Sequence, residues 1–196
     1  MLTKMLGQEY TGFYSAAVSL CNGWCFVLSA IIEAMTPEIV GAYHRSGGAF
    51  ERKNRQLYAV IFWISAGMAV VFCCFGRPLV GFVYGEDYLE AVTPLKILGW
   101  YTAFSYLGVA RNPWILCREA QSTLVWVYAA AAGANVVLNW RLIPRWGVSG
   151  AAAASLAAQV LSAVAVPWFI PELRENSRLM MEAILLKNLR NREEIP

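Results

Sequence analysis

Residues 135–159, NVVLNWRLIPRWGVSGAAAASLAAQ, contain two apolar segments separated by a short charged turn. Pro144 cannot continue a helix and Gly147 permits a tight reversal, so the stretch predicts two helices joined by a turn. Only Asn, Ser and Gln interrupt the apolar segments. The tryptophans and arginines of the turn suit a bilayer–water interface, where the rings lie among headgroups and the charges reach water. The stretch therefore predicts two neighbouring membrane-spanning helices.

The composition of the whole chain agrees with a membrane protein. Hydrophobic residues make up 58% and charged residues 15% of the 196 residues, and the mean hydropathy is +0.47. Soluble domains are about 45–50% apolar and about 25% charged. Eight Trp, nine Tyr and nine Phe fit the aromatic belts of a bilayer interface. The net charge of +3 is small and gives no indication of a nucleic-acid partner.

Five apolar segments have about the 20 residues that a helix needs to cross the hydrocarbon core. They lack the period-2 alternation of barrel strands, which favours helices. We therefore expect an all-α membrane protein with a bundle of about five transmembrane helices, at residues 14–36, 57–75, 94–116, 122–140 and 150–170.

The distribution of Lys and Arg predicts how these helices are oriented. Basic side chains are frequent in 41–56 and in the tail 171–196, and 117–121 contains Arg118, whereas 76–93 contains Glu86, Asp87 and Glu90. The positive-inside rule places the basic segments, including the C-terminus, in the cytoplasm. Residues 76–93 and 141–149 are then external, although Arg141 and Arg145 oppose this assignment.

The two ends of the chain lie outside the predicted spans. Residues 1–13 are expected to contain the end of a preceding helix, Met1–Leu6, and an external turn, Gly7–Gly12. We therefore interpret the chain as a fragment of a longer transporter. The alternative is an ordinary short extracellular N-terminus. In the tail, apolar residues recur at helical spacing among many charges. This pattern predicts an amphipathic helix along the inner membrane face, with a partner-docking helix as the alternative.

The last predicted span carries a pattern of small residues. Gly150, Ala154 and Ala158 recur every four residues on one helix face. Such spacing lets membrane helices approach closely. We expect this face to pack against another helix, although an alanine-rich helix without a special contact would have the same composition.

Three stretches together resemble a known family. NVVLNWRLIPRWGVSGAAAASLAAQ (135–159), GQEYTGFYSAAVSLCNGW (7–24) and GRPLVGFVYGEDYLEAVTPLKILGW (76–100) resemble, in order and spacing, the C-terminal half of Wzx-type polysaccharide and O-antigen flippases of the multidrug/oligosaccharidyl-lipid/polysaccharide (MATE-like) superfamily. The resemblance implies a carrier in the bacterial cytoplasmic (inner) membrane, working in lipopolysaccharide and other surface polysaccharide synthesis. Its substrate would be an undecaprenyl-pyrophosphate-linked oligosaccharide, moved outward by alternating access between two lobes. Besides membrane lipids, the expected partner is the missing N-terminal lobe or a second copy, and one half alone is expected to be inactive.

Polar side chains inside the predicted spans are candidates for a substrate cavity. Polar groups are costly in hydrocarbon unless they face a cavity or pair with each other. The candidates are Arg111, Asn112, Asn22, Glu33 and Gln159. For each of them, the alternative is a structural role: a place at the membrane interface, snorkelling to the surface, or a hydrogen bond between helices. Glu33 could also pair with Arg111.

The sequence gives no indication of an enzyme. It lacks the common hydrolase, metalloprotease and phosphate-binding motifs. Its cysteines have neither metal-ligand spacing nor partner histidines, so they are interpreted as small packing residues, and no metal or cofactor is expected. Two other functions remain open: a drug or metabolite exporter of the same superfamily, and a non-transporting membrane scaffold for polysaccharide synthesis.

Overall fold

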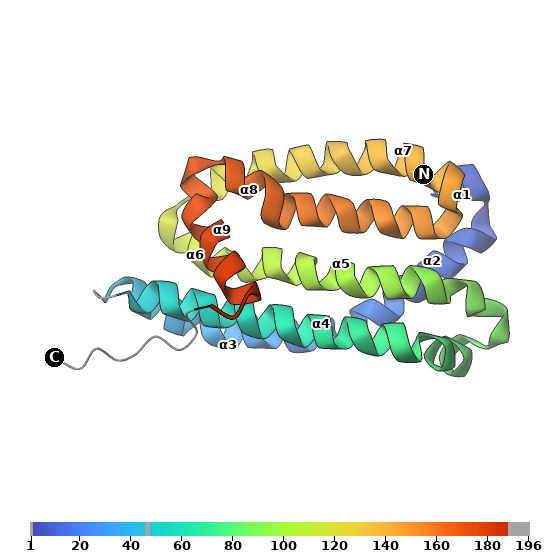
Figure 1. Ribbon diagram of the computed structural model, residues 1–196, viewed down its shortest axis with the longest axis horizontal. Helices are drawn as coiled ribbons and strands as arrows, with labels where there is room; N and C mark the ends of the chain where they lie inside the picture. Colours follow the sequence, from blue (N-terminus) through green and yellow to red (C-terminus); the bar gives the residue numbers. More distant parts are fainter. Residues whose placement is uncertain (1, 46–47, 188–196) are drawn as a thin grey trace.

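The computed structural model describes residues 2–45 and 48–187, and within these ranges helices are the only regular secondary structure. Most of the long helices run roughly parallel or antiparallel to one another, with short elements at the two ends of the bundle (Figure 1). The elements are α1 (Leu2–Leu6), α2 (Gln8–Asn22), α3 (Cys25–Tyr43), α4 (Ala49–Tyr84), the 3₁₀-helix η1 (Glu86–Ala91), α5 (Val92–Ala110), α6 (Asn112–Arg118), α7 (Gln121–Val160), the π-helix η2 (Leu161–Ala165), α8 (Val166–Phe169) and α9 (Pro171–Ile184).

Three helical segments are long and apolar enough to cross a membrane: Gln8–Tyr43, Ala49–Tyr84 and Gln121–Phe169. They correspond to four of the predicted spans, because the last segment folds back on itself and contains two; the predicted span 14–36 is divided between α2 and α3 by a turn. The remaining predicted span, 94–116, is formed by α5 and most of α6. The all-α membrane fold predicted from the sequence is confirmed.

The quoted stretch folds as a helical hairpin within α7. Gly147 has φ 56° and ψ −132°, the one non-helical residue of α7, and the two arms run antiparallel (Figure 1). A Cβ on Gly150 would lie 2.3 Å from the carbonyl oxygen of Leu142. The close approach at Gly150 is therefore made within the hairpin, whereas Ala154 and Ala158 are buried among other helices.

Two helices extend beyond the predicted spans because prolines do not end them. α3 continues through Pro37 to Tyr43, and α4 continues through Arg77 and Pro78 to Tyr84. A proline removes one backbone hydrogen bond and its ring crowds the carbonyl group four residues earlier. Packing offsets this cost in α4, where the atoms nearest to Gly76, two residues before Pro78, belong to side chains of α5. α4 is consequently about 54 Å long. Residues 76–84 are thus helical rather than part of an external loop.

The predicted turn at Gly7–Gly12 is shorter than expected. α1 ends at Leu6 and α2 already begins at Gln8, so the break is confined to Gly7, which has φ 102°. Glycine adopts this left-handed region without the steric cost that a Cβ imposes.

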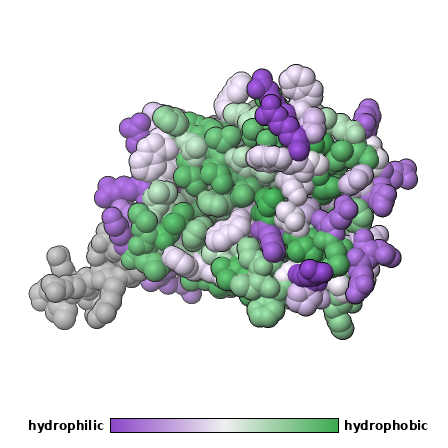
Figure 2. Space-filling model, turned by 45° about the vertical axis from the view of Figure 1, so that its right-hand side comes forward, coloured by the Kyte–Doolittle hydropathy of each residue, from purple (hydrophilic) through white to green (hydrophobic). Residues whose placement is uncertain are grey.

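Large apolar side chains cover much of the outer surface. Phe82 is 92% exposed, Trp126 76% and Phe26 71%. Figure 2 shows hydrophobic residues spread widely over one face, with hydrophilic groups mainly toward its edges. Isolated exposed apolar residues are normal in soluble proteins, but such a wide coverage suits contact with lipid.

The C-terminal helix α9 lies in the segment predicted to form an amphipathic helix, and one of its faces is covered by the bundle. α9 begins with Pro171 at its first turn and packs against α4. Its inward face, all of it buried, consists of Leu173, Asn176, Ser177, Leu179, Met180 and Ala183. The amphipathic pattern is thus used to cover the bundle. Residues 188–196 of the predicted tail lie outside the described residues.

Candidate functional site

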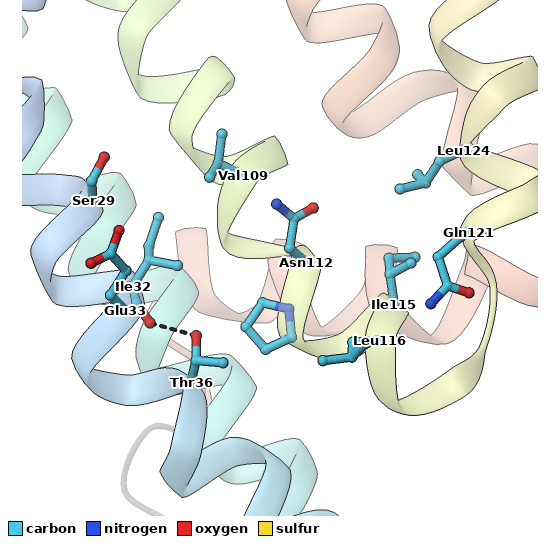
Figure 3. A pocket seen from close by; sticks show the side chains of 11 residues that line it. Ser29, Ile32, Glu33, Thr36, Val109, Asn112, Ile115, Leu116, Gln121 and Leu124 are labelled. Atoms are coloured by element: carbon cyan, nitrogen blue, oxygen red, sulfur yellow. Dashed lines mark hydrogen bonds between the residues drawn. The ribbon is translucent and has the colours of Figure 1, made fainter.

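A cavity of about 490 Å³ lies between α3, the end of α5, α6 and the start of α7. Figure 3 shows its two sides, with Glu33 on α3 and Gln121 on α7, and Asn112 between them. Most of its wall is apolar. We call it the α3–α7 cavity; its lining residues are Ser29, Ile32, Glu33, Thr36, Val109, Asn112, Pro113, Ile115, Leu116, Gln121 and Leu124.

The polar side chains of the α3–α7 cavity differ in whether they have a hydrogen-bond partner. Thr36 donates a hydrogen bond of 2.6 Å to the carbonyl oxygen of Ile32. Within the part of the chain that the structure describes, the side chains of Glu33, Asn112 and Gln121 make no hydrogen bond. Two amides and one carboxylate are therefore free to bind a ligand, and Glu33 is the one ionisable group among the described lining residues.

Arg111 is adjacent to Asn112 in sequence but lies outside this cavity. It is 2% exposed, and its Nε donates a hydrogen bond of 3.0 Å to Oδ1 of Asn176 on α9. Its two terminal nitrogens donate to the carbonyl oxygens of Ser162, at 3.4 Å, and Ala163. The pairing with Glu33 that the sequence left open is absent among the described contacts. Of the alternatives left open for Arg111, the structure shows structural pairing.

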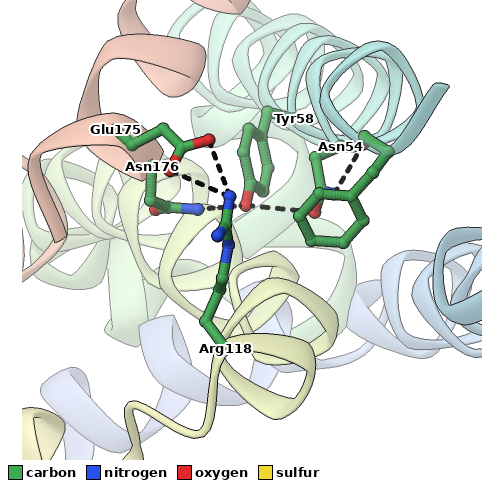
Figure 4. A network of polar contacts seen from close by, with 6 residues as sticks. Asn54, Tyr58, Arg118, Glu175 and Asn176 are labelled. Atoms are coloured by element: carbon green, nitrogen blue, oxygen red, sulfur yellow. Dashed lines mark hydrogen bonds and ion pairs between the residues drawn. The ribbon is translucent and has the colours of Figure 1, made fainter. Parts of the chain in front are cut away.

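A buried polar network extends from Arg111 into α4. Asn176 Nδ2 donates to the hydroxyl of Tyr58 over 2.5 Å, and this hydroxyl donates to Oδ1 of Asn54 over 3.4 Å. Asn54 in turn donates to the carbonyl oxygen of Phe50 at 2.8 Å. Figure 4 shows the part of this network between Asn176 and α4. These bonds connect α4, the end of α5, η2 and α9.

Arg118 forms a separate ion pair with Glu175 of α9, nearer the surface. Its guanidinium donates to both carboxylate oxygens of Glu175 at 3.1 Å (Figure 4). It also lies 5.7 Å from the ring centroid of Trp114, a cation–π distance. Burial raises the pKa of the neighbouring Cys117 thiol, and Arg118 acts in the opposite direction. All five cysteines are free thiols, although Cys74 is exposed rather than packed.

Gln159 lies in a second groove, of about 460 Å³, between α5 and the two arms of α7. We call it the α5–α7 groove; its polar lining residues are Tyr101, Tyr128, Asn135, Ser155, Gln159 and Ser162. Asn22 is exposed at the end of α2 and lines neither site. Of the five predicted cavity residues, the structure brings together only Glu33 and Asn112.

Sequence reasoning missed two features of these sites. Gln121 was placed in a loop between spans, and the tyrosines were counted as general aromatic content. Gln121, Tyr128 and Asn135 are separated by seven residues each. Seven residues are about two helical turns, so this spacing was a sequence signal for one polar face on the first arm of α7.

Comparison with known proteins connects the chain with a biological process. Residues 1–93 match a family model described as polysaccharide biosynthesis protein. An uncharacterized membrane protein of Methanocaldococcus jannaschii is 20% identical over 181 residues, which cover 91% of this chain and 35% of that protein. The chain thus spans about a third of the length of this relative. No solved structure matches the chain. The long apolar helices and the membrane relative support a multi-pass membrane protein, and residues 1–93 are similar to polysaccharide biosynthesis proteins.

Proposed function

We propose that this protein takes part in moving a lipid-linked oligosaccharide across a membrane. The observation that carries the proposal is the α3–α7 cavity, an open pocket between apolar helices into which the free amide groups of Asn112 and Gln121 face. Polar groups without partners are costly in an apolar surrounding, so they mark a place where a polar ligand is bound or passes. The match to a polysaccharide biosynthesis family suggests which ligand this is.

In this proposal, the substrate is a saccharide linked through pyrophosphate to an undecaprenyl-type carrier. Asn112 and Gln121 supply amide N–H donors for phosphate or hydroxyl oxygens and carbonyl acceptors for hydroxyl protons. The protein works in the bacterial inner membrane with the α6 and α9 end of the bundle in the cytoplasm. Because alternating access needs two lobes, transport also requires a second lobe or a second copy of the chain.

The proposal is tested by transport in membrane vesicles from the protein's own cells, which also contain any second lobe, with vesicles from cells that lack the protein as the control. The substrate is a fluorescent undecaprenyl-pyrophosphoryl saccharide, and a chemical quencher outside the vesicle destroys the fluorescence of every molecule in the outward-facing leaflet. The rate at which the remaining fluorescence is lost measures how fast the saccharide appears in that leaflet. Asn112→Leu removes one cavity amide and is expected to lower the rate about tenfold, whereas the matched Asn22→Leu, outside the cavity, leaves it unchanged. Equal rates in vesicles with and without the protein would reject the proposal. If the protein then copurifies with glycosyltransferases, the scaffold function takes its place.

A second function, export of cationic amphiphiles, is favoured by one observation. Glu33 is the ionisable lining residue of the cavity, and a carboxylate attracts cations and repels pyrophosphate. Glu33→Gln separates the two functions because it acts on them in opposite directions. It should abolish efflux of a cationic dye if the protein exports cations, and maintain or increase flux of the pyrophosphate-linked saccharide if it is a flippase.

A further inference from the structure

The α5–α7 groove is polar at a depth where the surroundings are apolar. Tyr101 lies near the middle of α5, and Tyr128 and Gln159 lie on opposite arms of the α7 hairpin. The segment containing α7 is long and apolar enough to cross a membrane. Lipid offers no hydrogen-bond partners, so polar side chains at this depth pair internally or face a ligand or water.

Part of the polar lining of the α5–α7 groove is already paired. Ser155 lies 3.3 Å from the Tyr14 hydroxyl, Asn135 accepts a hydrogen bond from Asn139 over 2.9 Å, and Ser162 donates to the carbonyl oxygen of Gln159.

Three groups in the groove remain free. In residues 2–45 and 48–187, the hydroxyls of Tyr101 and Tyr128 and the side-chain amide of Gln159 make no hydrogen bond. The amide of Gln159 reaches toward α5, since a Cβ on Gly108 would lie 3.6 Å from its Nε2. The free groups thus come from α5 and from both arms of α7, and they border one space.

The chemistry of these groups is neutral. The described lining of the groove includes no Asp, Glu, Lys, Arg or His. Its free groups are two phenol rings with their hydroxyls and one amide that both donates and accepts. A sugar ring combines an apolar C–H face with a rim of hydroxyls, which matches aromatic faces beside hydrogen-bonding groups. A phosphate would instead need a charged partner at this depth, and the adjacent Arg111 guanidinium is already bonded to Asn176 and to the Ser162 and Ala163 carbonyl oxygens.

The α5–α7 groove and the α3–α7 cavity share one face of α7. Gln121 and Leu124 line the cavity, and Tyr128, Ala131 and Asn135 line the groove. These positions follow each other at intervals of three or four residues, which is the spacing of one helix face. With a rise of about 1.5 Å per residue, the polar face extends about 21 Å from Gln121 to Asn135. Its polar members thus lead from one end of the bundle toward its middle.

We infer that the α5–α7 groove is a binding site for a neutral sugar ring, with Gln159, Tyr101 and Tyr128 as its hydrogen-bonding groups. Its volume of about 460 Å³ falls in the range of about 300–1,000 Å³ typical of small-molecule sites. The inference rests on the proposed function in one respect, namely that a lipid carrier brings the sugar to the groove. That the ligand is a sugar follows from the chemistry of the groove itself.

The test is binding of simple glycolipids to the full chain in lipid nanodiscs. The probes are tritiated dodecyl glucoside and dodecyl N-acetylglucosaminide, with dodecanol as the tail-only control and dodecyl phosphate as the charged control. Binding to empty nanodiscs is subtracted. The protein is expected to bind both glycosides more tightly than either control.

Two conservative variants keep the test independent of folding. Tyr128→Phe keeps the ring and removes the hydroxyl, and we expect about a fivefold loss of glycoside affinity, the factor for about one net hydrogen bond. Gln159→Leu removes both amide functions and should cost about tenfold or more. Asn22→Leu lies outside the groove and should bind as the unmodified protein does. Circular dichroism and thermal unfolding verify that each variant is folded.

The inference is overturned if the glycosides bind no better than dodecanol, or if both variants bind them with unchanged affinity. Its failure is distinguishable from failure of the proposed function. If saccharide transport is observed but glycoside affinity is the same in the groove variants as in the unmodified protein, only the sugar site is rejected. Variant-sensitive glycoside binding without transport would reject only the proposed function.

Discussion

Asn176→Leu removes the side chain through which α9 is connected to the interior of the bundle. Asn176 is fully buried, accepts a hydrogen bond from the Arg111 guanidinium at 3.0 Å and donates one to Tyr58 at 2.5 Å. Leucine has a similar volume, so the substitution removes hydrogen bonds without leaving a large cavity. The Arg111 Nε then loses its partner while its charge stays buried.

The expected loss in the free energy of unfolding is about 2.5 kcal/mol. The bond to the charged guanidinium contributes about 1.5 kcal/mol, near the upper end for interhelical bonds in membrane proteins, because the donor is charged. The bond to Tyr58 adds about 1 kcal/mol. Ser177→Ala is the matched control: Ser177 is also buried on α9, but its hydroxyl bonds only within the helix, to the Leu173 carbonyl oxygen. Its loss should cost under about 1 kcal/mol.

The assay is unfolding by SDS in mixed micelles, followed by circular dichroism, with limited proteolysis as a separate reading of α9 release. The double variant Arg111→Met/Asn176→Leu completes a thermodynamic cycle. Once the guanidinium is gone, Asn176 has lost its main partner, so the double variant should be more stable than the sum of the single losses predicts, by about 1.5 kcal/mol. Additive losses, or an Asn176→Leu effect equal to that of Ser177→Ala, would refute this account of the network.

Three other predictions concern packing and chemistry elsewhere in the bundle. Gly150→Ala places a methyl group 2.3 Å from the Leu142 carbonyl oxygen and should cost about 1–3 kcal/mol in the same SDS assay, whereas Gly133→Ala, with open space around it, should be neutral or stabilising by up to about 1 kcal/mol. Gly99→Ala forces a methyl group to 3.2 Å from the α4 backbone, so thermal unfolding should begin at a lower temperature. Cys21, a free and buried thiol, should react with a maleimide only after denaturation; rapid labelling of the folded protein, measured by mass spectrometry, would contradict its position.

The membrane fold follows from local properties of the chain. Apolar segments of bilayer length must form helices because lipid leaves the backbone no other hydrogen-bond partners. The hairpin also follows from local chemistry, since Gly147 adopts the positive φ of the reversal, although Pro144, expected to end the helix, lies within the first arm of α7. These features depend on neighbouring residues, which a sequence displays directly.

The helix ends were harder to predict because local preferences compete with packing. Pro37 and Pro78 each disfavour a continuing helix, yet α3 and α4 extend beyond them. The loss of one backbone hydrogen bond is modest beside the contacts of a long helix within the bundle. Nothing near either proline in the sequence reports those contacts.

The candidate sites show the same division. The sequence by itself determined that this chain forms a helical membrane bundle with a few polar groups inside its spans. Only the tertiary structure decided how those groups are used: Asn112 lines a cavity with Glu33, whereas its neighbour Arg111 bonds to Asn176, 65 positions further along the chain. The physical reason is that a polar side chain in an apolar bundle must find a partner in space, and its partner depends on how the helices pack.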